Sequence, residues 1–275
     1  MTAAQQLRQS WHRGPWVLVQ VHQTRGSVPR EVGAWMAVSA SETVDTIGGG
    51  RLEFDATLHA RAVLSGRAQE GVVRYALGPS LGQCCGGEVH LRFQCLPGDA
   101  NAFDWSPLQG ALTPVALFGG GHVGRALVRV LATLPLRIQW IDSRDAIFPP
   151  EMATLAQCEY SDPVHAAVAA LEPGSQVLIM SFSHAEDLDI VAACLQRLRS
   201  RNDLPYVGLI GSKTKWASFR QRLEARGFAP SELARITCPI GVPGIHDKRP
   251  EVIAVAVAAQ LLQVGALPDD AAGLH

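Results

Sequence analysis

The side chains with the most reactive chemistry are two adjacent cysteines, Cys84 and Cys85, in the stretch LGPSLGQCCGGEVHLRF. Neighbouring cysteines can close only a strained ring, so we expect free thiols here and no structural disulfide. The glycines that follow, Gly86 and Gly87, allow the backbone to approach a ligand closely. A deprotonated thiol binds soft metals and transfers sulfur. Two small residues buried in a tight turn would give the same pattern, so the residues alone leave both interpretations open.

A second motif, VALFGGGHVG, predicts a turn that binds a phosphate group. Gly119, Gly121 and Gly124 occupy the three glycine positions of G-x-G-x-x-G, between an apolar run and a helical pattern that begins at His122. The first glycine permits the tight turn, the second lets a phosphate approach, and the third packs helix on strand. Asp142 ends the next apolar run, about 20 residues further on, where an acid binds a ribose hydroxyl. The motif therefore indicates a nucleotide such as NAD(P), although a plain tight turn also favours glycine.

A third glycine cluster, TIGGGRLE, precedes another predicted helix. Free backbone amides of Gly48, Gly49 and Gly50 at a helix start would hold an anion, and Arg51 would add positive charge. A simple turn from strand to helix is the alternative. Weaker candidates follow later strands of the chain: Arg144, His184, Ser212, Lys213, Lys215, Cys238, Pro239, Gly241, His246 and Lys248.

The elements that must position these residues divide the chain into two halves, with a boundary near Pro107 in a segment rich in Pro, Gly, Asp and Asn. Residues 1–106 predict an α+β domain, with strands at 15–24, 33–40, 71–77 and 88–96 and a helix at 51–66. Residues 107–275 alternate apolar runs with helical patterns, which predicts a Rossmann-like, doubly wound parallel sheet and an α/β protein. Its strands are expected at 114–119, 136–142, 175–182 and 206–211. Its helices are expected at 122–134, 162–171, 186–201, 214–228 and 249–264, and Asp162 is expected to cap the second helix.

Composition excludes several classes of function. The 275 residues carry a net charge of −1 with no run of like charges, so nucleic acid is not an expected partner. No segment has the roughly 18 consecutive apolar residues that a membrane span needs, and the first residues lack the pattern of a signal peptide. We therefore expect a cytoplasmic protein whose six cysteines are reduced. The apolar final helix must be buried, against the sheet, against the other domain or against another subunit, which makes a homodimer plausible.

Taken in order, six segments closely resemble the XdhC/CoxI family of xanthine dehydrogenase accessory proteins, and the resemblance covers roughly residues 8 to 265. The segments are TRGSVPREVGAWM, TIGGGRLE, LGPSLGQCCGGEVHLRF, VALFGGGHVGRALVRVLATLPLRIQWIDSRDAIFP, VGLIGSKTKWASFRQRLEARGF and CPIGVPGIHDKRPEVIAVAVAAQLL.

The resemblance implies a molybdenum-cofactor chaperone without its own turnover. Such a protein binds molybdopterin cofactor, presents it to a cysteine desulfurase for sulfuration, and delivers it to apo-xanthine dehydrogenase. It also implies an N-terminal cofactor site at Gly48 to Glu53 and at Gln83, Cys84, Cys85, Gly86 and Gly87, and a Rossmann site at Gly119 to Gly124 with Asp142. Whether Cys84 or Cys85 contacts molybdenum, carries sulfur or only packs stays open. The competing hypotheses are an NAD(P)-dependent oxidoreductase and a scaffold whose Rossmann loop is empty.

Overall fold

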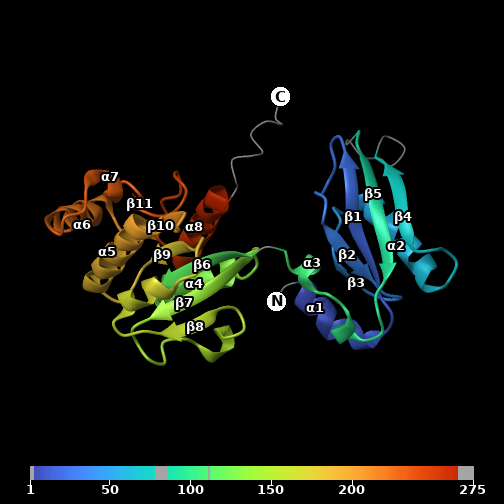
Figure 1. The fold of residues 1–275 in the computed structure, drawn as a ribbon, viewed down its shortest axis with the longest axis horizontal. Coiled ribbons are helices and arrows are strands. Elements are labelled where there is room, and N and C mark those ends of the chain that lie inside the picture. The colour runs from blue at the N-terminus through green and yellow to red at the C-terminus, as the bar shows by residue number, and fades with distance from the viewer. Residues whose placement is uncertain (1–2, 78–85, 111, 266–275) are drawn as a thin grey trace. The chain divides into compact units, whose positions relative to one another are not determined.

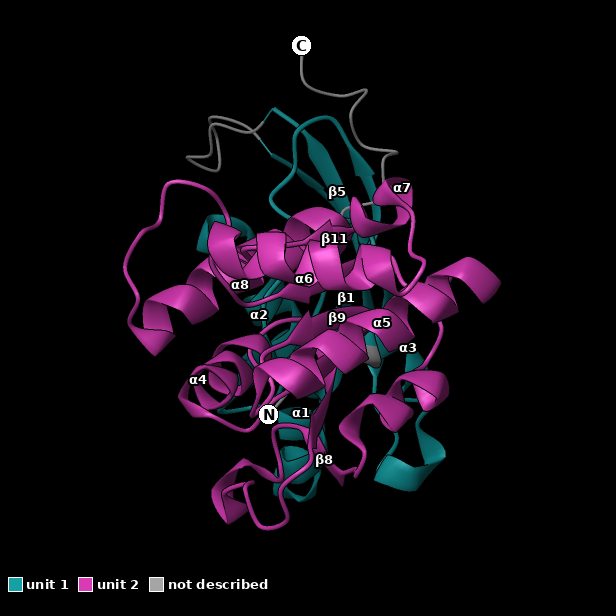
Figure 2. Cartoon of the chain, turned by 90° about the vertical axis from the view of Figure 1, so that its left-hand side faces the viewer, with its two compact units in different colours: residues 1–110 teal, residues 111–275 magenta. Residues whose placement is uncertain are grey.

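The computed structural model describes residues 3–77, 86–110 and 112–265, and the chain forms two compact units, residues 1–110 and 111–275 (Figures 1 and 2). Each unit is described by itself. In the sequence, the boundary between the units falls after Gly110, a few residues beyond the boundary expected near Pro107. The short helix α3 (Ser106–Gln109) belongs to the first unit because Leu108 is buried in that unit's core.

The first unit is built on a five-stranded antiparallel sheet in the order β3-β2-β1-β5-β4. Its strands are β1 (Val17–Arg25), β2 (Trp35–Val38), β3 (Thr43–Asp45), β4 (Gly71–Ala76) and β5 (Glu88–Cys95). Its longer helices are α1 (Ala3–Ser10) and α2 (Gly50–Leu64), with 3-10 turns at Trp11–Arg13 and Ala100–Ala102.

Both faces of this sheet are covered, because successive side chains of a strand point to opposite faces. Val17, Val19 and Val21 of β1 enter one core together with α2, whereas Leu18 enters a second core with α1. The covered sheet therefore fixes the ends of its strands, and the loops between them carry the glycine motifs.

The second unit is built on a six-stranded parallel sheet in the order β11-β10-β9-β6-β7-β8. Its strands are β6 (Thr113–Phe118), β7 (Leu136–Asp142), β8 (Gln157–Tyr160), β9 (Gln176–Ile179), β10 (Tyr206–Leu209) and β11 (Ile236–Thr237). Its helices are α4 (His122–Leu131), α5 (His184–Ser200), α6 (Lys213–Ala225), α7 (Pro230–Leu233) and α8 (Pro250–Gly265), with 3-10 segments at Pro150–Met152 (η4) and Val164–Ala170 (η5). This arrangement confirms the predicted α/β class with a Rossmann-like second half.

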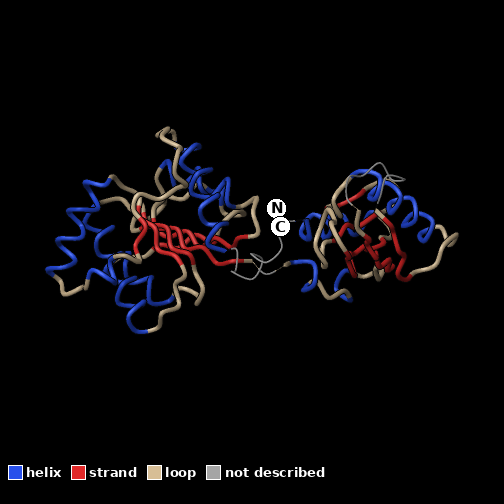
Figure 3. The backbone as a smooth tube through the Cα atoms, turned by 90° about the horizontal axis from the view of Figure 1, so that it is seen from above, coloured by secondary structure: helices blue, strands red, loops and turns tan. Residues whose placement is uncertain are grey.

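Helices cover both faces of the parallel sheet (Figure 3). Val115 and Leu117 of β6 pack with α4 and α8, whereas Ala116 and Phe118 pack with η5, α5 and α6. The apolar α8 lies against α4 and the sheet, where Val257 and Leu261 are fully buried. Burial within its own unit thus accounts for one face of this apolar helix, whereas Val255 and Leu262 are exposed. Among the described residues, no helix is long and apolar enough to cross a membrane.

One predicted helix is wrong. Residues 162–171 were expected to form an α-helix capped by Asp162, but Pro163 is extended and Val164–Ala170 forms a 3-10 helix. Extended backbone at Pro163 and at Leu171 limits the helical segment to seven residues. The buried guanidinium of Arg197 fixes the end of this segment, because its Nη1 donates to the carbonyl oxygen of Val168 at 2.6 Å and its Nη2 to that of Leu171 at 2.8 Å.

Candidate functional site

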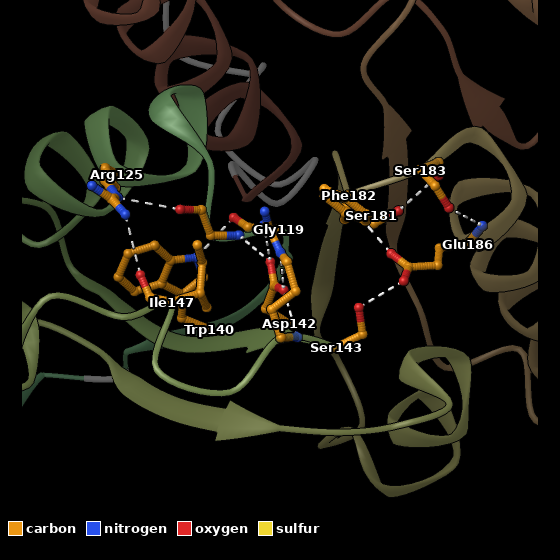
Figure 4. Close-up of polar contacts among 12 residues, drawn as sticks. Gly119, Arg125, Trp140, Asp142, Ser143, Ile147, Ser181, Phe182, Ser183 and Glu186 are labelled. Atoms are coloured by element: carbon orange, nitrogen blue, oxygen red, sulfur yellow. Dashed lines mark hydrogen bonds and ion pairs between the residues drawn. The ribbon is translucent and has the colours of Figure 1, made fainter.

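The glycine motif of the second unit lies at the carboxyl end of β6, between that strand and α4 (Figure 4). β6 lies between β7 and β9 in the sheet, so the order of strands along the chain reverses at this point. Open α/β sheets bind ligands at the carboxyl ends of their strands where such a reversal occurs. The structure therefore places Gly119 to Gly124 where this fold binds ligands.

The three motif glycines differ in whether the protein leaves space for a Cβ atom. A Cβ atom at Gly119, whose φ is +124°, would lie 2.0 Å from the carbonyl oxygen of Met180, and one at Gly124 would lie 2.1 Å from that of Gly119. Both glycines are therefore required by the protein's own packing. Gly121 has a φ of −72° and no neighbouring atom within 4 Å of an added Cβ. The open space above Gly121 is available to a ligand.

Two side chains fix the shape of this loop. The indole Nε1 of Trp140 donates to the carbonyl oxygen of Gly119 at 2.9 Å, and Arg125 Nε donates to that of Gly120 at 3.3 Å. Arg125 Nη2 also donates to the carbonyl oxygen of Ile147 at 3.2 Å, which ties α4 to the segment after β7 (Figure 4). The carbonyl oxygens of Gly119 and Gly120 are thus hydrogen-bonded to side chains of the protein. The helix α4 begins at His122, directly after the loop.

Asp142 is buried beneath the loop, where four hydrogen bonds reach its carboxylate. Oδ2 accepts the backbone N–H of Gly120 at 2.6 Å and Arg144 Nη2 at 2.8 Å. Oδ1 accepts the backbone N–H and the Nε of Arg144, both at 2.9 Å. Burial alone would raise the pKa of Asp142, but the hydrogen bonds from Arg144 and Gly120 outweigh it and lower the pKa below 3.8. The carboxylate is therefore ionised at neutral pH.

A second acid joins the ends of β7 and β9. Glu186 Oε1 accepts the hydroxyl of Ser143 at 2.6 Å, and Oε2 accepts the backbone N–H of Phe182 at 3.2 Å (Figure 4). The ring of Phe182 is 66% exposed and lies 4.6 Å from the Arg144 guanidinium carbon. His184, a weaker candidate from the sequence, begins α5 and meets Phe219 edge to face. The rim of the loop thus carries one exposed aromatic ring with a cation above it.

The structure also reveals a buried ion pair that the sequence analysis did not assign. Asp187 is 2% exposed, and its Oδ2 accepts Lys215 Nζ at 2.6 Å while its Oδ1 accepts the backbone N–H and hydroxyl of Ser181 at 2.8 and 2.7 Å. Lys215 Nζ also donates to the carbonyl oxygen of Ile210 at 2.9 Å. This pair connects the carboxyl ends of β9 and β10. The sequence offered one signal for Asp187: in the stretch SFSHAEDLD, two acids follow a serine that can cap a helix.

The remaining candidates of the second unit have separate positions. Ser212 caps α6 by accepting the backbone N–H of Lys215 at 3.1 Å, and Lys213 is exposed. Burial raises the pKa of the Cys238 thiol to about 11, although the Lys215 charge lowers it and the Asp187 charge adds to the rise. Cys238 is therefore protonated at neutral pH. Pro239, His246 and Lys248 are exposed, and the N–H of Gly241 donates to Gln260 Oε1 of α8 at 2.7 Å.

In the first unit, three motif segments that are distant in the sequence meet. A Cβ at Gly48 would lie 2.6 Å from the side chain of Pro29, and a Cβ at Gly87 would lie 2.2 Å from the carbonyl oxygen of Ser27. Gly26 faces Gly87 as well, because its added Cβ would lie 3.3 Å from the Gly87 Cα. The segment after β1 thus contacts both the GGGRLE loop and the two glycines that follow Cys85.

The amides of the GGGRLE loop are mostly used within the loop. Glu53 Oε2 accepts the backbone N–H of Ile47 and of Gly49, both at 3.1 Å, as well as the Thr46 hydroxyl. The N–H of Gly48 donates to Thr46 Oγ1 at 3.1 Å. Positive φ angles of 116°, 74° and 65° at Gly48, Gly49 and Gly50 explain the three glycines. The N–H groups of Gly48 and Gly49 are therefore used by the protein itself, and neighbouring arginine side chains are a further source of positive charge for an anion.

Such charge is present at the meeting segments. Arg25 ends β1 and is exposed, and Arg30 Nη1 donates to the carbonyl oxygen of Thr46 at 3.4 Å. Arg51 Nε donates to Asp55 Oδ2 at 2.9 Å and the side chain is more than half exposed. Three guanidinium groups thus belong to the segments that carry the motifs.

Gln83, Cys84 and Cys85 lie outside the described residues. Gly86, the next residue, is described, and an added Cβ there would meet nothing within 4 Å. Four other cysteines are described as free thiols: Cys95, Cys158, Cys194 and Cys238. Over the described ranges, no group of three or more His, Cys, Asp or Glu side chains is arranged to hold a metal ion.

Comparison with known proteins agrees with this organisation. The chain is 25% identical over 258 residues to YqeB of Escherichia coli K12, described as an uncharacterized protein; the match covers 91% of the chain and 43% of YqeB, so the chain spans less than half of that relative. A Bacillus halodurans protein described as a xanthine dehydrogenase has the same fold, with a TM-score of 0.76 and 19% identity over 99% of this chain and 98% of that one. A model of the XdhC Rossmann domain matches residues 115–261, and a model of the XdhC and CoxI family matches residues 11–76. The chain therefore belongs to the XdhC and CoxI family.

Proposed function

We propose that the chain is an accessory protein for a xanthine dehydrogenase, and that it carries molybdenum cofactor as cargo. In this proposal the first unit binds the cofactor, a cysteine desulfurase exchanges an oxo ligand for a sulfido ligand, and the chain transfers the product to the apo-enzyme. The observation that carries the proposal is the meeting of three motif segments around Pro29, Gly48 and Gly87. A dimer and a cytoplasmic location belong to the same proposal.

The chemistry of these segments fits such a cargo. Molybdopterin has a phosphate group and a soft molybdenum–sulfur centre, and the segments combine guanidinium groups with two consecutive thiols in the sequence. Arg25, Arg30 and Arg51 are the candidates for the phosphate. Cys84 and Cys85 are the candidates for the soft end, since their thiolates would be the ligands that a soft metal prefers.

The decisive experiment is a titration with molybdenum cofactor released anaerobically from a molybdoenzyme. Wild type is compared with a Cys84→Ala, Cys85→Ala double variant, and Cys95→Ala is the matched control because it removes an exposed thiol at the end of β5. We expect tight binding by wild type and Cys95→Ala, and a loss of at least tenfold in the double variant. Equal binding by all three proteins would exclude the thiols from the site, and no binding by any would refute the proposal.

The rival function is an NAD(P)-dependent oxidoreductase, which the open space at Gly121 favours. It requires a dinucleotide at the glycine loop and a substrate-dependent change in nicotinamide absorbance. A screen of small substrates with both nicotinamide cofactors tests it. Turnover would establish the rival, whereas transfer of cofactor to apo-xanthine dehydrogenase in the absence of nicotinamide nucleotides would establish the accessory function.

A further inference from the structure

The Rossmann fold implies a dinucleotide whose adenosine ribose is held by the acid after the second strand, and that acid is Asp142. An ionised carboxylate offers about four acceptor positions to hydrogen-bond donors. At Asp142 all four are filled: Oδ1 accepts the backbone N–H and Nε of Arg144, and Oδ2 accepts Arg144 Nη2 and the N–H of Gly120. The side chain of Asp142 is 1% exposed. These residues do not fit a ribose diol.

Three of the four donors belong to Arg144, two residues along the chain. Its guanidinium makes a bidentate contact with the carboxylate, which is the strongest arrangement available to this pair. The guanidinium also lies over the ring of Phe182, on the loop after β9. A ribose hydroxyl would therefore have to displace a charged donor that is held from two sides.

We infer that Arg144 is the specificity-determining residue of the glycine loop, and that it withdraws Asp142 from ribose recognition. A ligand at this loop is then selected through its phosphate, at the open Gly121, and not through its ribose hydroxyls. Asp142 acts as a structural acid that holds the Gly120 amide. This inference concerns the second unit and does not depend on whether the first unit carries molybdenum cofactor.

The test compares ADP with 2′-deoxy-ADP by isothermal titration calorimetry at pH 8, using the full chain. For wild type we expect both nucleotides to bind with equal affinity, and binding of neither would overturn the selection of a ligand through its phosphate. Arg144→Ala removes two donors from Asp142 and leaves the backbone N–H in place. This variant should gain a preference for ADP of about tenfold, the effect expected from one hydrogen bond to a charged group.

Three further variants make the result decisive. Arg137→Ala removes an arginine from the opposite end of the same strand, where it pairs with exposed Glu172, and should behave like wild type. The double variant Arg144→Ala, Asp142→Asn should lose the gained preference. Arg144→Gln provides a second opening of the site if thermal melting shows that Arg144→Ala does not fold. A tenfold preference for ADP in wild type, or no gain in a folded Arg144 variant, would overturn the inference.

Discussion

Replacement of Lys215 by methionine tests whether the buried ion pair with Asp187 holds the adjacent strands β9 and β10 of the second unit together. The Asp187 side chain is 3% exposed and that of Lys215 is 13% exposed. Removal of one partner leaves a buried charge without compensation, which costs about 3–5 kcal/mol. Asp187 would retain its two hydrogen bonds from Ser181, so we expect the lower end, about 3 kcal/mol of unfolding free energy.

The assay is hydrogen exchange with mass spectrometry across a urea series, because peptides from β9 and β10 report on the second unit alone. The double variant Lys215→Met, Asp187→Asn removes both charges and should recover at least half of the loss. Arg226→Met, which breaks an exposed ion pair with Asp189, is the matched control and should change the unfolding free energy by less than about 1 kcal/mol. A Lys215→Met variant as stable as this control would refute the reasoning, as would a double variant no more stable than the single one.

Three further predictions concern acid stability, thiol reactivity and the first unit. The pKa of folded Asp142 lies below its ordinary value, so the stability that it contributes is complete above the pKa of the unfolded chain and is lost as pH falls through the lower folded value. The melting temperatures of Asp142→Asn and wild type should therefore converge only at acid pH. With a pKa of about 11, Cys238 should react with iodoacetamide at pH 8 more slowly than exposed Cys95, as peptide mass spectrometry would show. Gly87→Ala places a Cβ 2.2 Å from the Ser27 carbonyl oxygen, so cofactor binding should fall at least tenfold while β9 and β10 keep their exchange protection.

The parallel sheet could be predicted because its central strands are continuous apolar runs, buried on both faces. The outer strands could not. β8 is four residues with two polar side chains, and β11 is two residues, so neither gives a periodic signal. The 3-10 segment after Pro163 was missed because the contacts that fix its end come from Arg197 on α5, far away in the sequence.

The parts of the candidate site that are formed by residues close together in the sequence could be predicted. The glycine motif and the position of Asp142 follow from a strand–turn–helix pattern that is local in the sequence. The partners of Asp142 were not predictable, because an arginine two residues away in an exposed turn is usually solvated. The ion pair of Asp187 with Lys215 requires the register between two strands, which sequence spacing does not supply.

Substitutions of the Rossmann-loop glycines test which motif positions are required for folding and which leave space for a ligand. At Gly119, alanine would adopt a φ of +124°, which costs about 1–3 kcal/mol, and its Cβ would also clash with the Met180 carbonyl oxygen. At Gly121, alanine fits the observed φ of −72° and open space; it is a poorer helix cap but it reduces the entropy of the unfolded chain, so the net change should stay within about 1 kcal/mol.

The two variants therefore separate folding from binding. Gly119→Ala should abolish exchange protection in β6 and β9, whereas Gly121→Ala should retain it. If a phosphate group occupies the space above Gly121, the added methyl group fills that space, and the folded Gly121→Ala variant should lose nucleotide binding. Equal binding by Gly121→Ala and wild type would mean that this space is not used by a ligand, because nothing in the described protein itself requires glycine there.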